Sequence, residues 1–231
     1  MSDAADDSKG PPYPPPPHGE WHWPPQLTMV VAILLQVLLP NRLSVGDLIK
    51  WILPALEGVM LVALVLASPQ RLEAPHSLRR ILTLGITAVV SIANGIALVL
   101  LAHLLLNKDL SSGPQGHSLI IAGSEIWLTN VLLFAFWYWE MDRGGPGLRA
   151  VGLDQRPDFL FPQMTDEPSA LYPGWRPMFV DYLYLSLTNA IAFSPTDTMP
   201  LSVQAKLVMG FQSLISLVTI GLVISRAVNI L

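Results

Sequence analysis

Apolar residues run along the chain in long blocks, and polar residues gather between the blocks. Four blocks reach the roughly 20 residues that a helix needs to cross a bilayer. Two further blocks are shorter. The apolar residues form continuous runs and not the one-sided stripes that are typical of water-soluble helices. The pattern predicts an all-α integral membrane bundle of five or six transmembrane helices. The six blocks are residues 27–39, 48–67, 81–106, 119–141, 178–193 and 206–231.

The two short blocks differ in character. Block 27–39 follows Trp21 and Trp23, which are typical anchors at lipid headgroups. Block 178–193 would form a helix of roughly 24 Å, less than the roughly 30 Å of a hydrocarbon core. It either crosses the membrane inside a bundle or enters the membrane and turns back as a re-entrant helix. Its polar residues are Asp181, Ser186, Thr188 and Asn189.

The polar segments divide the chain into four parts. Residues 1–26 form a proline-rich tail, which we expect to be disordered and solvated; it could recruit an SH3-like binder, although a plain flexible leader is favoured. Residues 27–141 form a four-helix transmembrane region. Residues 142–177 form a loop too rich in proline and glycine for a long helix or a central strand. Residues 178–231 form the last unit. We expect this loop to lie on the membrane surface, in contact through the side chains of Phe159, Leu160, Phe161 and Trp175.

Composition supports a membrane protein and excludes several other classes. Of 231 residues, 52% are hydrophobic and 13% are charged, with a net charge of -4 and a mean hydropathy of +0.48. The partner is therefore a lipid bilayer, and no basic patch is present for a nucleic acid. Cysteine is absent, which excludes disulfides and thiolate sites. The sequence predicts no metal site, no cofactor and no enzyme activity, and a multi-pass protein of the plasma (inner) membrane.

The distribution of Lys and Arg bears on the topology. Six full spans with both termini in the cytoplasm put nine basic residues inside and four outside, as the positive-inside rule requires. If block 178–193 turns back and the last helix keeps its direction, the ratio is reversed. The charge count therefore favours six spans.

One segment resembles a known family. From position 181 the chain reads DYLYLSLTNAIAFSPTDTMPLSVQAKLVMG, followed by an apolar helix. This segment resembles the pore helix, filter and inner helix of the potassium-channel superfamily, which carries YxSxxTxTTVGYGDxxPxTxxGK. The matching positions are Tyr184, Ser186, Asp197, Pro200, Ser202, Ala205, Lys206 and Gly210.

The filter itself departs from the family. Ser194 and Thr196 occupy the two glycine positions, and Pro195 between them is fixed near a φ of about -65°. A potassium filter needs backbone conformations that glycine permits, so we expect no potassium-selective filter. The resemblance implies a channel-like scaffold, tetrameric if it conducts, with an altered pore at the outer end of the last helix. The whole chain also resembles bacterial multi-pass membrane proteins with this C-terminal motif, which implies no particular activity.

Three functions follow as hypotheses. The first is cation passage through a channel-like homo-oligomer, with Ser213, Ser216 and Thr219 as a polar face of the last helix. The second is a small transporter using proton-linked carboxylates, although acids within spans can also serve packing alone. The third is a non-transporting scaffold.

Aromatic residues 137–139 are typical of an interfacial belt at the end of a membrane span. The pore and ion-binding candidates are Thr188, Asn189, Ser194, Pro195, Thr196 and Asp197, and the intramembrane carboxylates are Glu57, Glu125 and Asp181.

Overall fold

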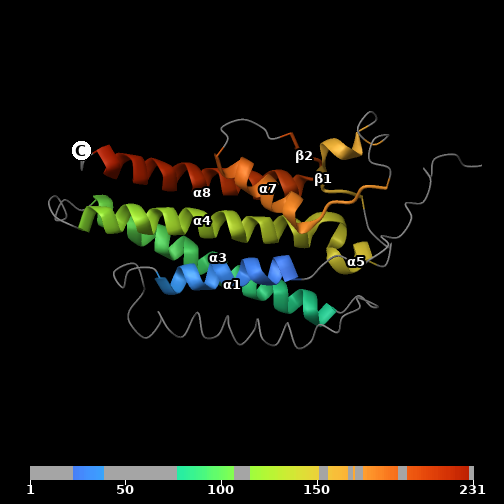
Figure 1. The fold of residues 1–231 in the computed structure, drawn as a ribbon, viewed down its shortest axis with the longest axis horizontal. Coiled ribbons are helices and arrows are strands. Elements are labelled where there is room, and N and C mark those ends of the chain that lie inside the picture. The colour runs from blue at the N-terminus through green and yellow to red at the C-terminus, as the bar shows by residue number, and fades with distance from the viewer. Residues whose placement is uncertain are drawn as a thin grey trace, which may run out of the picture.

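The protein is a bundle of long helices with one short helix laid along it. The computed structural model describes residues 23–38, 77–106, 115–150, 156–165, 169, 174–191 and 197–228. The bundle is built on α4, which packs against each of the other main helices (Figure 1). The prediction of an all-α helical bundle is confirmed. The main helices are α1 (Trp23–Leu38), α3 (Ser77–Leu106), α4 (Gln115–Met141), α7 (Phe179–Ile191) and α8 (Val203–Val228).

The apolar blocks of the sequence correspond to these helices. Within the described residues, three stretches are long and apolar enough, by length and composition, to cross a membrane: Thr83–His103, Leu119–Gly144 and Val203–Val228. The described part of block 27–39 lies on α1, and that of block 178–193 lies on α7 and directly before it. The block at 48–67 and residues 1–22 of the proline-rich tail lie outside the described residues. Residues 23–26, the end of that tail, belong to α1, so the expectation of disorder is wrong for them.

The core at one end of α4 is aromatic. Tyr138 is fully buried and Trp139 is 3% exposed, and both pack edge-on against rings of neighbouring elements, Phe159 and Phe179. The prediction of an interfacial belt at 137–139 is therefore wrong for these two residues. Trp137 is partly exposed and donates a hydrogen bond through Nε1 to the Oγ of Ser91, 3.1 Å away. Tyr138 and Trp139 are buried because later segments of the chain fold back over this end of α4.

Helix α4 ends in a sharp turn. Arg143 lies in the left-handed region with a φ of 54°, and it is followed by Gly144 at 79° and Gly145 at 101°. Left-handed residues terminate helices, and glycine adopts them without a Cβ clash. The turn forms a 3-10 helix, η3 (Asp142–Gly144), and leads into α5 (Pro146–Ala150), whose first residue is proline, as helix starts favour.

The loop after α5 is folded into the bundle. Its elements are β1 (Phe159–Leu160) and a 3-10 helix, η4 (Pro162–Met164). Phe159 is fully buried and Phe161 is 3% exposed, both within the main core. The expectation that these rings lie on the membrane surface is therefore wrong, because the rings fill space against Tyr138 and Tyr182 instead.

A two-stranded ladder joins this loop to the start of α8. Strand β1 pairs antiparallel with β2 (Met199–Pro200), so that Phe159 faces Pro200 and Leu160 faces Met199. The N–H of Leu201 donates to the carbonyl oxygen of Asp158 over 2.8 Å. We call the end of the bundle that holds β1, β2, η3 and α5 the strand end, and the opposite end the far end.

The path of α7 follows from this ladder. The chain enters α7 at the strand end and has returned to the strand end at β2, from which α8 begins (Figure 1). At about 1.5 Å per residue, α7 is about 20 Å long, whereas α8 is about 39 Å long. Helix α7 therefore does not run the length of the bundle. This geometry is that of a segment that turns back, one of the two arrangements that the sequence leaves open.

Candidate functional site

The first turn of α7 is capped by its own acid. The backbone N–H of Met178 donates to Oδ2 of Asp181 over 2.7 Å, the backward half of a capping box. Burial raises the pKa of the Asp181 carboxyl, while the hydrogen bonds from the backbone of Met178 and from its own backbone act in the opposite direction. The structure places this candidate carboxylate at the start of α7, where it satisfies a free backbone donor.

The inner face of α7 carries a hydrogen-bonded cluster that we call the polar junction: Tyr138, Ser186, Asn189, Gln212 and Ser213. It joins α4, α7 and α8. The side chain of Gln212 is fully buried; its Nε2 donates to the Oγ of Ser186 over 2.7 Å, and its Oε1 accepts from Nδ2 of Asn189 over 2.8 Å. The hydroxyl of Tyr138 also donates to Oε1 of Gln212.

Asn189 and Ser186 extend the junction to backbone groups. Nδ2 of Asn189 donates to the carbonyl oxygen of Met209 over 3.0 Å, and its Oδ1 accepts from the hydroxyl of Ser213 over 3.2 Å. The hydroxyl of Ser186 donates to the carbonyl oxygen of Val131 over 2.7 Å. Asn189 is thus held within the bundle, directly before the segment at 192–196. Mutually satisfied polar groups of this kind fix one helix arrangement, because an unpaired partner is costly in an apolar surrounding.

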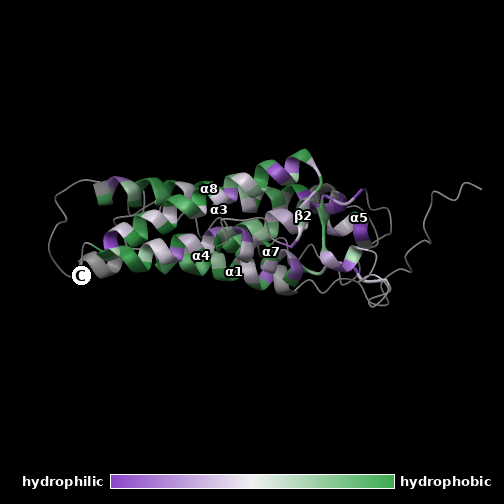
Figure 2. Cartoon of the chain, turned by 90° about the horizontal axis from the view of Figure 1, so that it is seen from above, coloured by the Kyte–Doolittle hydropathy of each residue, from purple (hydrophilic) through white to green (hydrophobic). Residues whose placement is uncertain are grey.

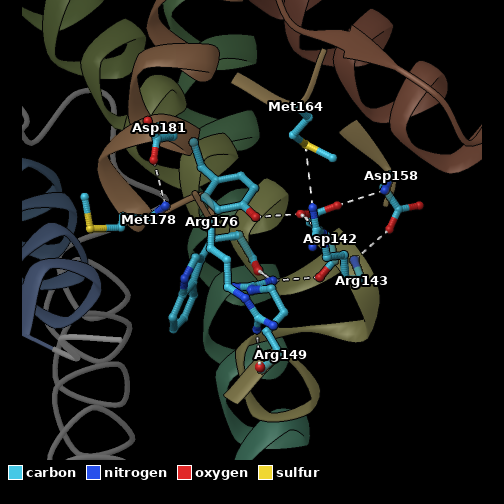
Figure 3. Close-up of polar contacts among 10 residues, drawn as sticks. Asp142, Arg143, Arg149, Asp158, Met164, Arg176, Met178 and Asp181 are labelled. Atoms are coloured by element: carbon cyan, nitrogen blue, oxygen red, sulfur yellow. Dashed lines mark hydrogen bonds and ion pairs between the residues drawn. The ribbon is translucent and has the colours of Figure 1, made fainter. Parts of the chain in front are cut away.

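A second cluster lies at the strand end around Asp142, a fully buried carboxylate (Figure 3). Its Oδ2 accepts from the hydroxyl of Tyr182 over 2.6 Å, and its Oδ1 accepts from the N–H of Asp158 over 2.8 Å. In return, Oδ2 of Asp158 accepts from the N–H of Arg143 over 3.1 Å. Nε of Arg143 lies 3.7 Å from Oδ2 of Asp142. This one carboxylate therefore ties the end of α4 to α7 and to the segment that precedes β1.

Arg149 closes the end of α4 from the other side. Its Nη1 donates to the carbonyl oxygens of Trp139 and Asp142, over 2.9 and 2.6 Å, and its guanidinium stacks against the rings of Trp139 and Tyr182. A cation at the last carbonyls of a helix complements the helix dipole. Arg176 in turn donates from Nη1 to the carbonyl oxygen of Arg149 over 3.1 Å. Hydrophilic residues gather around α5 at this end, while the long helices carry extended hydrophobic stretches (Figure 2).

The polar face of α8 points into the bundle. Ser216 is 1% exposed and accepts from Nδ2 of Asn130 over 3.1 Å, and Thr219 is fully buried. Ser213 is partly buried in the polar junction. The polar face predicted for α8 thus packs inside the single chain. The outward face is apolar instead, with exposed side chains at Leu207, Phe211, Leu214, Leu217, Val218 and Ile224.

Helices α4 and α8 approach each other closely near the far end. A Cβ added at Gly123 would lie 2.4 Å from Cγ2 of Val223, which no real structure tolerates without movement. On the outward face of α8, by contrast, Gly210 and Gly221 have nothing within 4 Å of an added Cβ. Glycine is thus required at position 123 by packing, and positions 210 and 221 leave open space.

The remaining candidate residues are spread over the molecule. The hydroxyl of Thr188 donates to the carbonyl oxygen of Tyr184 within α7, over 2.9 Å. Asp197 is exposed at the strand end, shortly before β2. Glu125 is partly exposed on α4, and its Oε2 is buried without a hydrogen-bond partner among the described residues. The structure therefore does not bring Asp197 and Glu125 together, since they lie toward opposite ends of the bundle. Glu57, Ser194, Pro195 and Thr196 lie outside the described residues.

The sequence patterns did not single out the Asp142 cluster. Asp142, Tyr182 and Arg149 belong to separate segments, and only folding joins them. The one signal in the sequence is the DRGGPG run that starts at Asp142, which predicts a sharp turn but not a buried carboxylate. Within the described residues, no group of three His, Cys, Asp or Glu side chains is placed to hold a metal ion.

Comparison of the chain with protein-family models, with curated proteins and with solved structures finds no match.

Proposed function

We propose that the protein is a multi-pass protein of the plasma (inner) membrane that passes cations as a homo-oligomer, with α7 as a re-entrant helix. The observation that carries this proposal is the return of the chain from α7 to the strand end, where β2 pairs with β1. A short helix that enters and leaves a bundle on one side, followed directly by a long apolar helix, is the arrangement of a pore helix and an inner helix. The resemblance of residues 181–210 to the potassium-channel superfamily points to the same arrangement.

Cations are attracted by the turn between α7 and α8. Asp197 is exposed there, and a carboxylate at a pore mouth raises the local cation concentration. The polar junction holds the end of α7 beneath this turn through Asn189 and Gln212. Without the filter glycines, passage discriminates poorly between potassium and sodium.

The path lies between copies of the chain. The outward face of α8 is apolar, with Leu214, Val218 and Ile224 exposed. Copies that pack around this face, as a tetramer, enclose a narrow apolar constriction, and such constrictions gate by dewetting. Ions would cross this constriction only when the α8 helices move apart.

Flux through liposomes tests the proposal. The purified protein is expected to release potassium and sodium at similar rates, and Asp197→Asn is expected to lower both. Asp7→Asn, in the tail, removes the same single charge and is the matched control. An Asp197→Asn variant that conducts as fast as Asp7→Asn contradicts the role of the turn, and absence of flux in every variant contradicts the channel.

Glu125 supports a second candidate function. Its buried Oε2 has no hydrogen-bond partner among the described residues, so this carboxylate is placed to take up and release a proton within α4. A proton-linked transporter would show pH-dependent uptake that fails in Glu125→Gln. Cation flux that is insensitive to pH and to this substitution rules the transporter out.

A further inference from the structure

The two ends of the bundle differ sharply in basic residues. Helices α3 and α8 both begin at the strand end and run antiparallel to α4. An added Cβ at Gly145 would lie 3.8 Å from Nε of Arg80 in α3, and Leu201 pairs with Asp158 just before α8. Arg226 in the last turn of α8 is the one Lys or Arg among the described residues of the far end. The strand end holds seven, namely Arg79, Arg80, Arg143, Arg149, Arg156, Arg176 and Lys206.

This asymmetry orients a membrane protein. Lys and Arg close to the ends of spans are retained in the cytoplasm during insertion, and Asp and Glu contribute little to the choice. The rule acts on the unfolded chain as it is inserted, so the later burial of Arg143 and Arg149 does not weaken it. The sequence places Lys108 between α3 and α4, at the far end. With Lys108 included, the strand end has seven Lys and Arg residues and the far end has two. The strand end has the charge of a cytoplasmic face.

The charge count favours six spans, whereas the pore-like spacing favours a re-entrant segment. The two agree if the chain turns back after α7 and α8 runs outward. The unfavourable count arises only if the last helix runs inward while block 178–193 turns back. If α8 instead runs outward, and if blocks 27–39 and 48–67 both cross, the ratio is again nine inside to four outside. Relative to the six-span count, only Lys206 and Arg226 exchange sides.

We propose that the strand end is the cytoplasmic face, so that α7 enters the membrane from the cytoplasm and the turn at Asp197 opens toward it. This inference rests on the proposed function in taking α7 as re-entrant. It reverses the orientation that the family resemblance implies, in which the turn lies at the outer face. The exposed side chains of Arg80, Arg156 and Lys206 then lie beside the anionic headgroups of the inner leaflet.

The absence of cysteine allows a direct test, because a single introduced cysteine has no background. Three variants suffice: Gly147→Cys in α5, Asp197→Cys beside β2, and Ser112→Cys between α3 and α4. An added Cβ at Gly147 meets nothing within 4 Å, and Asp197 is exposed. Each variant is treated with a membrane-impermeant maleimide in intact cells and, separately, in inside-out vesicles.

The expected result is that Gly147→Cys and Asp197→Cys react only in inside-out vesicles, while Ser112→Cys reacts only in intact cells. The opposite pattern for all three overturns the orientation and leaves the re-entrant helix in place. Reaction of Gly147→Cys and Asp197→Cys on opposite faces means that α7 crosses, which overturns the proposed function as well.

A fusion provides a readout that does not depend on labelling. Alkaline phosphatase joined after Leu231 is expected to be active, and green fluorescent protein at the same position is expected to be dark, because the far end of α8 lies outside the cytoplasm. Bright fluorescence with inactive phosphatase would overturn the orientation.

Discussion

The hydroxyl of Tyr182 donates a hydrogen bond of 2.6 Å to Oδ2 of Asp142, across forty residues of sequence. This contact joins the first turns of α7 to the end of α4. The same carboxylate accepts from the N–H of Asp158, which precedes β1. One buried acid thus fixes where α7 starts and where the chain returns after it.

Replacing Tyr182 with Phe is expected to lower the free energy of unfolding by about 1–3 kcal/mol, because a buried carboxylate oxygen loses a hydrogen-bond donor. Unfolding in detergent measures the change. Tyr184→Phe is the control, since this side chain is 59% exposed on the same helix and its loss is expected to stay within about 0.5 kcal/mol. Equal effects of the two substitutions would contradict the role given to the Tyr182–Asp142 bond.

Replacing Gln212 with Leu keeps the approximate size of the side chain but removes its bonds to Ser186, Asn189 and Tyr138. We expect the free energy of unfolding to fall by at least about 1–3 kcal/mol, the cost of leaving one buried polar group without a hydrogen-bond partner. The melting temperature in detergent is expected to fall as well. Gln204→Leu, at an exposed position of the same helix, is the matched control. A melting temperature that does not fall below that of the control would show that the junction contributes nothing.

Because α4 and α8 are in close contact at Gly123 and Val223, we expect a substitution at one position to compensate for a destabilising substitution at the other. Gly123→Ala places a Cβ 2.4 Å from Val223 and is expected to destabilise the protein by about 1–3 kcal/mol. Val223→Ala in the same chain removes the clashing methyl group and is expected to restore much of the loss. Gly221→Ala, which meets open space, is expected to be neutral or to gain up to about 1 kcal/mol. Failure of the double variant to recover would mean that the two helices do not meet at this point.

The raised pKa of Asp181 predicts a pH dependence. A carboxyl whose pKa is higher in the folded than in the unfolded state contributes most stability below its unfolded pKa, and this contribution declines as the pH rises through the folded pKa. The stability of the native chain relative to Asp181→Asn is therefore expected to fall as the pH rises above the unfolded aspartate pKa of about 3.9 and through the higher folded pKa. Denaturation of both proteins across this range measures the difference. A difference that grows with pH would mean that the hydrogen bond from Met178 outweighs burial.

The long helices could be predicted from the sequence, because α3, α4 and α8 are continuous apolar blocks and hydropathy depends only on neighbouring residues. The partners of polar residues could not. Asn189 and Gln212 are separated by 23 positions, and neither position indicates that their side chains meet. The aromatic run at 137–139 fits a membrane belt by composition. Tyr138 and Trp139 of this run lie instead in the core, because Phe159 and Phe161 return from a loop that carries no periodic signal.

The path of α7 illustrates the same limit. Its length and polar residues leave two paths open, and the charge count separates the two paths only if the last helix is assumed to run inward. The pairing of Phe159 with Pro200 decides the path, and a two-residue strand is too short to be recognised from sequence.

The ladder between β1 and β2 has a consequence for biosynthesis. Helix α7 is too short to act as a stop signal in a translocon, and the groups that hold its return, Asp158 and Leu201, are separated by more than forty residues of nascent chain. The bond between them can form only after the ribosome has passed Leu201. The start of α8 is therefore fixed late. An arrest of translation before Leu201 would leave α7 with its contacts to α4, through Tyr182 and Ser186, but without the ladder that holds the chain after it.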